Sequence, residues 1–428
     1  MNICCAIIIF SVVMVFSAGS LHAGERKLED LQILVDAALA HNPEVSASNA
    51  HQQMLESRAR QAGSLEDPML MLKIQNGVVS DPLNFRRDSM TQKVVGISQQ
   101  LPWYGKRDLR GSVARLDADA THQMRLERIL EIVRSVKETA YQLYFTDKSL
   151  EIVAKNTRIM DDFITLAETR YMVGQGAQQD IFKAQIEKSK LLDMRITLEQ
   201  QRRSLEIRLN SLLYRPLETP VGTIPDPRIT PLAFGDAALM EQAEKNRPLL
   251  KSMQAQIGKS KVAQSLARKE FFPDFTVSFE YMQREPAMGS DGSDMYSLGL
   301  TFNLPLQRER RHAMLAEAIS EQTMAGAELN DARNGIRGVI ADLLSQMERR
   351  RKLVELYKSG IIPQAEQALE SAVIAYRVGK VDFLALLDSR LTLFNYEREY
   401  YDSLADYQIR LAQLEATVGG DLIESHKQ

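Results

Sequence analysis

The chain has 428 residues, enough for two or three globular domains of about 150 residues each. It contains only 22 glycines and 14 prolines, whereas these two types make up roughly 12% of an average protein. The chain therefore has few turns and must consist of long elements. Its 53 Lys and Arg residues nearly balance its 56 Asp and Glu residues, which disfavours a nucleic-acid-binding protein with a strongly basic surface.

The first 23 residues have the features of a secretory signal peptide. The segment is apolar over residues 3–16, contains no charged side chain and ends in small residues at Ala23. The alternative is an uncleaved N-terminal anchor, but the apolar run is shorter than the roughly 20 residues that a membrane-spanning helix needs. Both cysteines, Cys4 and Cys5, lie in this segment. Cleavage would therefore leave a mature chain without disulfides, thiolate metal sites or an N-terminal lipid anchor.

The rest of the sequence is an internal repeat of about 205 residues. Four motifs occur twice in the same order, at offsets of 203 or 205 residues. The pairs are Pro43 and Pro248, Pro68 and Pro273, Leu101-Pro102 and Leu304-Pro305, and Tyr171 with Gly174 and Tyr376 with Gly379. We therefore expect five segments: a signal peptide (1–23), a first structural repeat (24–214), a proline-rich linker (215–235), a second structural repeat (236–420) and a tail (421–428).

Each copy is predicted to begin with a helix followed by two strands. Residues 28 to 63 and 236 to 270 are rich in helix-forming residues and end at a proline-containing motif that cannot continue a helix. Apolar and polar side chains then alternate with the period of a strand. The predicted strand pairs are 68–76/92–101 and 273–284/295–304.

Each copy is predicted to end with a long helical hairpin. Leucines recur every seven residues at Leu191, Leu198, Leu205 and Leu212, which is a coiled-coil period. Residues 106 to 173 contain no proline and a single glycine, Gly111. A continuous helix over this segment is on the order of 100 Å long, which exceeds the core of an ordinary domain.

Four strands per chain are too few for a membrane barrel made by a single copy. After residue 25 no apolar run is long enough for a membrane-spanning helix, so any membrane insertion must use strands. Four strands cannot close a barrel, and open strand edges are not tolerated in lipid. Three chains would supply a closed barrel with an aqueous channel, which the hairpins continue as a helical tube.

The predicted fold class is therefore mainly α with a small β part. It consists of long coiled-coil hairpins and four strands per chain, assembled into a trimeric α-barrel and a transmembrane β-barrel of about 12 strands. A soluble periplasmic coiled-coil scaffold is the alternative from another class. It explains the heptads but leaves the alternating strands of each repeat unaccounted for.

The duplicated motifs resemble the TolC family of bacterial outer-membrane efflux proteins over roughly residues 28 to 420. The resemblance rests on the twofold repeat, the NP and NRP motifs, LPWYGKR after the second strand, and the turn motifs YMVGQGAQQD and YRVGKVDFLALLD. It implies a homotrimer in the outer membrane with a periplasmic extension, surrounded by outer-membrane lipid. It also implies docking on a periplasmic adaptor (membrane fusion) protein and an inner-membrane pump, which we expect to be of the RND type.

The resemblance extends to a branch of the family. The motif QQLPWYGKR is more similar to the branch that serves heavy-metal or cation efflux pumps than to the multidrug branch. A multidrug or type I secretion duct of the same fold is the alternative. In each case the chain is expected to be a passive exit duct, with no enzymatic activity, no cofactor and no nucleic-acid partner.

The resemblance also implies a pore aperture at the hairpin turns. Counted from the glycine of each turn motif, Asp180 and Asp388 match acidic positions that narrow the pore, and Tyr376 matches an aromatic that helps to lock the turn. Three copies of such a carboxylate would favour cations or gate by repulsion. The alternative is that Asp180 and Asp382 are helix N-caps, which Asp favours, and that Asp388 is a solvated surface residue.

The chain departs from the family pattern at this aperture. The second aspartate position is Ala385, the arginine position is Val381, and Asp382 has no clear equivalent. We therefore expect the aperture to be held differently here, with Lys380 or Arg377 as the candidate residues.

Two further pairs of residues are candidate contact sites. Gly174 and Gly379 permit tight turns and would suit contact with the adaptor, although a plain turn glycine is equally compatible with the sequence. Trp103 and Tyr104 precede a basic segment and would suit a membrane interface; packing where a strand becomes a helix is the alternative.

The sequence contains no motif typical of a metal site or of a catalytic site. The six histidines are scattered, and no two of them have the i, i+4 spacing on one helix that a metal site uses. The sequence also lacks a nucleophile elbow, a phosphate-cradling loop and an HExxH motif. We therefore predict no metal site in the chain.

Overall fold

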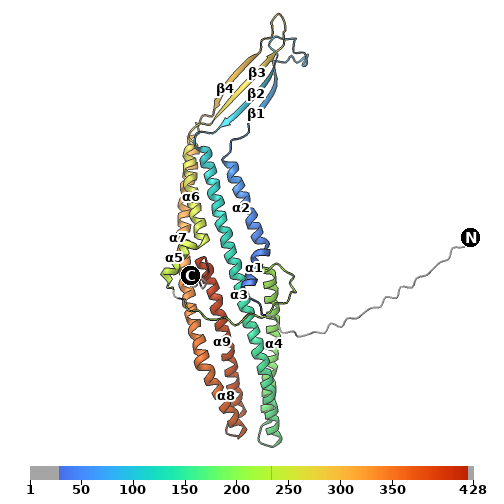
Figure 1. Cartoon of the computed structure of the whole chain (residues 1–428), viewed down its shortest axis with the longest axis vertical. Coiled ribbons are helices and arrows are strands. Elements are labelled where there is room, and N and C mark those ends of the chain that lie inside the picture. Colours follow the sequence, from blue (N-terminus) through green and yellow to red (C-terminus); the bar gives the residue numbers. More distant parts are fainter. Residues whose placement is uncertain (1–27, 233, 423–428) are drawn as a thin grey trace, which may run out of the picture.

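The computed structural model describes residues 28–232 and 234–422. The expected signal peptide (1–23) and residues 423–428 of the expected tail lie outside these ranges. The described chain is an elongated rod of long helices, with a small β-sheet at one end and two helical hairpin turns at the other (Figure 1). The prediction of a mainly helical chain with a small β part of four strands is confirmed.

Each repeat begins with two helices where the sequence suggested one. A proline occupies the first turn of the second helix in each pair. Proline has a fixed φ and no N–H, so it starts a helix well but interrupts one that is already running. In the first repeat the Asn42 side chain caps the new helix by accepting a hydrogen bond from the backbone N–H of Glu44, at 2.9 Å. The four helices are α1 (Leu31–His41), α2 (Pro43–Ala62), α5 (Asp236–Asn246) and α6 (Pro248–Lys269).

The four strands form one antiparallel sheet in the order β1-β2-β3-β4. The central strands β2 and β3 come from different repeats and pair along their whole length, from Gln92 opposite Arg284 to Leu101 opposite Phe275. The two repeats therefore share one sheet, and within the described chain β1 and β4 each keep one edge without a partner strand. The strands are β1 (Met69–Gln75), β2 (Gln92–Leu101), β3 (Phe275–Arg284) and β4 (Met295–Phe302).

The two faces of the sheet differ in polarity. Cross-strand pairs such as Leu70 opposite Ile97, and Phe279 opposite Leu298, place large apolar side chains on one face, which we call the apolar face. These side chains are exposed although they are apolar. The opposite face carries polar side chains, including the ion pair of Lys73 with Glu280 at 3.6 Å. The apolar face consists of Leu70, Leu72, Ile74, Val95, Ile97, Val277, Phe279, Tyr281, Tyr296, Leu298 and Leu300.

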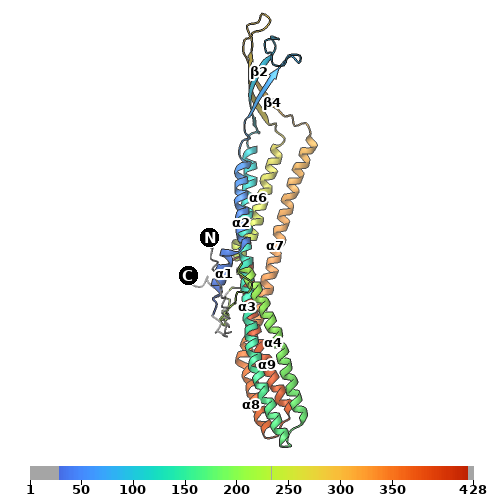
Figure 2. The ribbon, with the colours of Figure 1, turned by 90° about the vertical axis from the view of Figure 1, so that its right-hand side faces the viewer.

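The hairpins form the body of the rod, and both turns lie at its lower end in the side view of Figure 2. Helix α3 has 67 residues, which corresponds to a length of about 100 Å. In the second repeat one π-helical turn, Tyr357–Ile361, separates α7 from α8. Pro363 follows that turn and has no N–H to donate to a carbonyl one turn earlier, which accounts for the irregularity. The hairpin helices are α3 (Lys106–Met172), α4 (Gln178–Leu212), α7 (Arg308–Leu356), α8 (Ile362–Arg377) and α9 (Phe383–Val418).

Over the described residues, the core is distributed along the rod in three clusters of buried apolar side chains and is not gathered at one centre. The proline-rich segment between the repeats packs against the middle of the rod. Arg202 donates to the carbonyl of Val221 at 3.1 Å, and the Tyr407 hydroxyl donates to the carbonyl of Thr230 at 2.7 Å. These bonds hold the connection between the repeats against α4 and α9.

Candidate functional site

The two hairpin turns have the same backbone structure. Each helix ends in a Schellman motif, in which the N–H groups after the glycine and at the glycine close the last helical turn. The bonds run from Gln175 to Arg170 (2.8 Å) and from Gly174 to Tyr171 (3.0 Å), and 205 residues later from Lys380 to Ala375 (2.9 Å) and from Gly379 to Tyr376 (3.0 Å). The duplication is thus preserved at the level of single hydrogen bonds.

The two turn glycines have a conformational role. Gly174 has φ 73° and Gly379 has φ 75°, in the left-handed region where a Cβ atom is sterically disfavoured. The tight reversal of each hairpin therefore accounts for both glycines, and contact with an adaptor remains a prediction. Both glycines are exposed at the end of the rod.

One side chain, that of Arg170 at the end of α3, joins the two turns. Its guanidinium donates to the carbonyl of Tyr376 in the second hairpin and, at 3.1 Å, to the carbonyl of Gln175 in its own turn. It also lies 4.7 Å from the centre of the Tyr376 ring, within the range of a cation–π interaction. Arg170 was not among the predicted residues. The usable signal is that its equivalent in the second repeat is Ala375, so the two turns differ in charge at a duplicated position.

Tyr376 lies in the interior of the hairpin end. Its side chain is 3% exposed and packs edge to face against Phe383, with ring centres 5.7 Å apart. Burial raises the pKa of the Tyr376 hydroxyl; the charge of Asp180 also raises it, and the charge of Arg170 opposes both. The phenol is therefore neutral at physiological pH. Asp180 is half-buried in the first turn of α4, whose N-cap is Ala177, so Asp180 is not the cap residue.

The acidic and basic residues of the second turn lie at its surface. Asp382 is the N-cap of α9, and its carboxylate accepts a hydrogen bond from the backbone N–H of Ala385 at 2.9 Å. Asp388, Lys380 and Arg377 are exposed. Within the described residues these three side chains form no ion pair, so the contact between the turns of one chain comes from Arg170 and not from Lys380 or Arg377.

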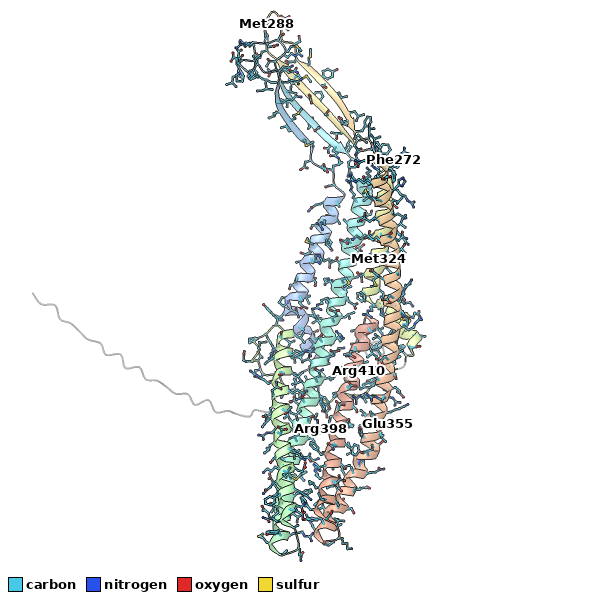
Figure 3. The ribbon with its side chains drawn as sticks, turned by 180° about the vertical axis from the view of Figure 1, so that it is seen from behind. Phe272, Met288, Met324, Glu355, Arg398 and Arg410 are labelled. Atoms are coloured by element: carbon cyan, nitrogen blue, oxygen red, sulfur yellow. The ribbon has the colours of Figure 1, made fainter. Side chains whose placement is uncertain are left out.

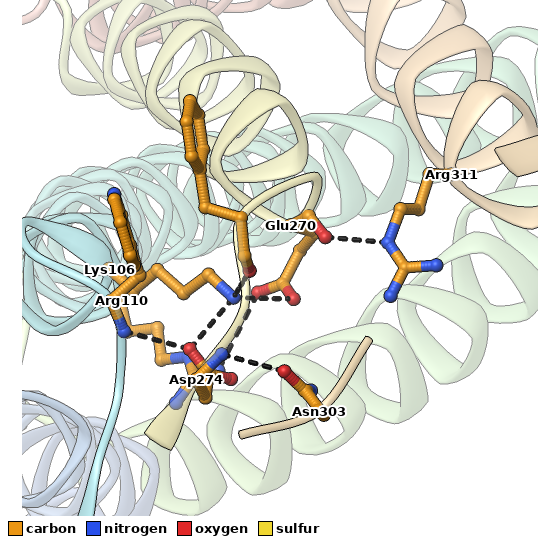
Figure 4. A network of polar contacts seen from close by, with 8 residues as sticks. Lys106, Arg110, Glu270, Asp274, Asn303 and Arg311 are labelled. Carbon is orange, nitrogen blue, oxygen red and sulfur yellow. Dashed lines mark hydrogen bonds and ion pairs between the residues drawn. The ribbon is translucent and has the colours of Figure 1, made fainter. Parts of the chain in front are cut away.

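A second cluster of polar groups lies where the sheet meets the helices. Lys106, in the first turn of α3, is 1% exposed. Its ammonium group lies 2.9 Å from a carboxylate oxygen of Asp274 and 3.3 Å from one of Glu270, and it donates to the carbonyl of Phe272 at 3.0 Å (Figure 4). A buried ammonium ion is costly unless it is paired and hydrogen-bonded, and these three oxygens meet that requirement.

Further bonds tie the remaining segments to the same cluster. Asp274 accepts from the backbone N–H of Trp103 at 2.8 Å, and its own N–H donates to the side chain of Asn303 at 2.7 Å. Arg311 of α7 donates to the carbonyl of Glu270 at 2.6 Å. The cluster, which we call the junction network, therefore joins the ends of β2, α6 and β4 to the starts of β3, α3 and α7.

The junction network fixes the charge of Asp274. Burial alone would raise the pKa of its carboxyl group, but the hydrogen bond from Trp103 and the hydrogen bond and charge of Lys106 outweigh burial and lower the pKa below the ordinary value. The carboxylate is thus ionised in the folded chain over the physiological pH range.

Trp103 and Tyr104 have different surroundings. The Trp103 ring stacks on Phe272, with centres 5.2 Å apart and planes 14° apart, so it packs where the strand becomes a helix. Tyr104 is 87% exposed. Figure 3 shows Phe272 at this junction and Met288 in the loops at the opposite end of the sheet. Of the two predicted interface residues, only Tyr104 presents its ring fully to the surroundings of a single chain.

The described ranges contain no group of three or more His, Cys, Asp and Glu side chains arranged to hold a metal ion. Over the same residues, none of the helices combines the length and the hydrophobicity of a membrane-spanning segment.

Comparison with known proteins gives a family match and several relatives. The family model described as "Outer membrane efflux protein" matches residues 34–213 and 239–420, one segment in each expected repeat. The cobalt-zinc-cadmium resistance protein CzcC of Cupriavidus metallidurans is 26% identical over 162 residues, which is 38% of this chain and 38% of that protein. The pyoverdine export outer membrane protein OpmQ of Pseudomonas aeruginosa is 22% identical over 425 residues, covering 91% of this chain and 84% of that protein.

The fold also matches a solved structure. The outer membrane protein VceC of Vibrio cholerae superposes with a TM-score of 0.77 at 18% identity, covering 92% of this chain and 96% of that chain. At this identity the likeness concerns the fold.

Proposed function

Because the chain belongs to the family of outer membrane efflux proteins, which are transport channels of the bacterial outer membrane and not enzymes, we propose that three copies form the exit duct of a tripartite efflux system. In this duct the sheets lie in the outer membrane and the helices extend into the periplasm. The hairpin turns form its closed periplasmic end. An inner-membrane pump supplies the energy, so the duct itself needs no chemistry.

The observation that carries the proposal is the combination of the apolar face with two open strand edges. Side chains such as Leu72 and Leu298 are more than two-thirds exposed in a single chain, which is unfavourable in water and favourable in lipid. The edges of β1 and β4 need partner strands, because unpaired backbone groups are not tolerated in lipid. Pairing β4 of one copy with β1 of the next satisfies both requirements, and three copies make a barrel of about 12 strands.

The closed end of the duct is built from the two turns. Arg170 holds the second hairpin against the first through the carbonyl and ring of Tyr376, which keeps the turns close together. In three copies Asp180 and Asp388 would line the aperture with carboxylates and favour cations. Lys380 and Asp382, exposed on the second turn, are candidates for contacts between neighbouring copies.

The partner proteins of the duct are inferred from the side chains exposed at the hairpin turns. Gly174 and Gly379 lie at the exposed end of the rod, next to the exposed apolar side chains of Met172, Val173 and Val378. This surface suits the helical tip of a periplasmic adaptor protein, which connects the duct to an inner-membrane pump of the RND type. Tyr104, and Trp103 through its stacking on Phe272, mark the membrane surface at the other end of the helices.

Heavy-metal cations are the cargo that we infer. The support is the alignment with a protein named for cobalt, zinc and cadmium resistance and the carboxylates near the turns. An organic cargo is the alternative, supported by the longer alignment with a pyoverdine export protein. The two are separated by deleting the gene and measuring growth inhibition: sensitivity to cobalt, zinc and cadmium salts supports the metal, and sensitivity to organic toxins with unchanged metal tolerance contradicts it.

The duct itself is tested by fractionation and electrophysiology. The mature chain should be found in the outer-membrane fraction as a heat-resistant oligomer, and the purified oligomer should conduct ions in a planar bilayer. Release of the chain by osmotic shock would instead identify a soluble periplasmic scaffold, and an oligomer that conducts no current would contradict the duct.

A further inference from the structure

Arginines surround the junction of the sheet and the helices and form a surface that we call the basic collar. It consists of Arg58, Arg107, Arg268, Arg308 and Arg310. Four of these side chains are exposed and Arg107 is half-buried. Among the residues that the structure describes, none of the five pairs with a carboxylate, in contrast to Lys106 and Arg110 of the same region, which pair with Glu270.

Favourable interaction with the helix dipole explains only two of the five arginines in the basic collar. Arg58 and Arg268 lie near the C-terminal ends of α2 and α6, where the helix dipole favours a cation. Arg107, Arg308 and Arg310 lie in the first turns of α3 and α7, where the dipole disfavours a cation and Asp or Glu is preferred. The helix dipole therefore does not account for these three arginines. Arg107 donates to the carbonyl of Gly63 at 3.2 Å, whereas no hydrogen bond or ion pair of the Arg308 and Arg310 side chains is found among the described residues.

The two repeats place such a cation at the same position. Arg107 follows Pro102 by the same number of residues as Arg310 follows Pro305. Both lie in the first helical turn after a strand of the shared sheet. One pair of the five arginines, Arg107 and Arg310, thus occurs at equivalent positions in the two repeats.

The collar adjoins a band of exposed apolar side chains. Tyr104 is 87% exposed, and Leu304 and Leu306 are 64% and 79% exposed; all three lie between the strands and the helices that carry the arginines. At the far end of the sheet most basic side chains are paired with carboxylates, for example Arg87 with Asp81 at 3.6 Å and Lys93 with Glu285 at 3.1 Å. Arg284 at that end donates to the side chain of Gln92 at 3.3 Å instead. By the same criterion, arginines without a carboxylate partner are therefore more numerous at the helical end of the apolar face than at its loop end.

We propose that the basic collar binds the phosphate groups of anionic phospholipids in the membrane leaflet that faces the helices. The inference rests on the proposed function, because it requires the apolar face to lie in a membrane. Guanidinium groups hydrogen-bond phosphate oxygens in bidentate geometry, and an apolar band followed by cations matches the order of acyl chains and phosphates at a bilayer surface. The three copies of the duct would then carry a continuous ring of lipid contacts at the junction.

The test compares two lipids on the intact purified oligomer. The purified oligomer of the mature chain is inserted into vesicles of phosphatidylethanolamine, with and without phosphatidylglycerol. It is then extracted in detergent, and the lipids that stay bound to it are counted by native mass spectrometry. The unaltered protein should retain phosphatidylglycerol preferentially, and less so at high salt, because exposed charges are screened. Replacement of both Arg107→Gln and Arg310→Gln should weaken this retention by about fivefold for each arginine removed.

Two matched variants serve as controls. Arg107→Lys with Arg310→Lys keeps both positive charges but removes the hydrogen bond from the Arg107 side chain to the Gly63 carbonyl, which is 3.2 Å long in the unaltered chain. This variant should keep most of the lipid preference. Arg158→Gln with Arg203→Gln removes two exposed arginines of α3 and α4 that pair with no carboxylate in the described chain, and should leave the lipid preference unchanged.

Two outcomes would overturn the inference, and they differ. If the glutamine variant inserts and retains phosphatidylglycerol as the unaltered protein does, the basic collar does not bind lipid although the duct stands. If the unaltered chain inserts into neither type of vesicle, as judged by flotation, the proposed function fails with it.

Discussion

At the scale of single residues, Arg170 is the group that distinguishes the two otherwise equivalent turns. It binds the carbonyl of Tyr376 and that of Gln175, and it lies over the Tyr376 ring. A hydrogen bond from a charged donor contributes about 1.5–3 kcal/mol. Arg170 therefore supplies the polar contact between the two turns, whereas the ring contact of Phe163 with Phe383 and the bond of Arg390 to Asn156 join the hairpins farther along.

Replacing Arg170→Ala should loosen the closed end of the duct. At the turns, the second hairpin loses the hydrogen bond and the cation–π contact that Arg170 makes with Tyr376. The turns should then separate more readily, and single-channel conductance in a planar bilayer should rise several-fold. Arg377→Ala removes an exposed cation without a partner in the described chain and is the matched control. Equal conductance of the two variants would contradict the role of Arg170.

Asp388→Asn should weaken the block of the channel by multivalent cations. The substitution keeps the shape of the side chain and removes a charge that we place at the aperture, where three copies act together. Glu399→Gln, at an exposed position farther along α9, is the control and should leave the block unchanged. If the block is the same in both variants, Asp388 is a solvated surface residue.

At the scale of elements, the sequence was most informative where a period or a repeat is strong. Strand alternation located the sheet within about two residues of its observed ends, because in each strand every second side chain belongs to the apolar face. The breaks at Asn42 and Arg247 were missed, since helix-forming residues continue on both sides and only the following prolines mark the boundary. The π-helical turn before Pro363 was missed for the same reason.

The polar contacts between elements were not predictable from the sequence. Lys106 was expected only as part of a basic anchor, yet it is buried between Glu270 and Asp274, which are more than 160 residues away. Arg170 contacts a carbonyl of the other hairpin, a partner that leaves no mark in the sequence. In both cases the partner is set by how two long helices are placed relative to each other, which local patterns do not encode.

Lys106→Met should destabilise the junction strongly. Removing one member of a buried ion pair leaves the carboxylates of Asp274 and Glu270 without their main partner, at a cost of about 3–5 kcal/mol. Thermal unfolding of the purified oligomer, followed by circular dichroism, should show a clearly lower midpoint than for Lys261→Met, whose side chain is exposed on α6. Equal midpoints would show that the junction network contributes little to stability.

Acid should destabilise the same region through Asp274. Because the pKa of this carboxyl group is lower in the folded chain than its ordinary value of about 3.9, the folded state gains stability from the ionised form above that value. This contribution is lost as pH falls through the lower, folded-state pKa. The unfolding midpoint should therefore fall in this acidic range, and Asp274→Asn should flatten that part of the profile, whereas Asp162→Asn, at an exposed position, should not.

At the scale of the whole molecule, one chain is incomplete. Its described part exposes the apolar face and leaves the outer edges of β1 and β4 unpaired, and it places the two hairpin turns at the opposite end of a rod whose core is spread over three clusters. In the proposed duct, further copies would cover the strand edges and enclose a passage along the helices. The low content of turns in the sequence follows from this elongated design.

Cross-linking between strand edges tests the central claim most directly. After cleavage of the expected signal peptide the chain has no cysteine, so Lys73→Cys on β1 and Ser297→Cys on β4, both on the polar face, provide a unique reactive pair. Ser98→Cys with Ser278→Cys, which face each other within one sheet, is the control and should give no product larger than one chain. In isolated outer membranes treated with a bismaleimide, the edge pair should give products that end at three chains; monomers alone, or a ladder that continues beyond three, would contradict the trimeric duct.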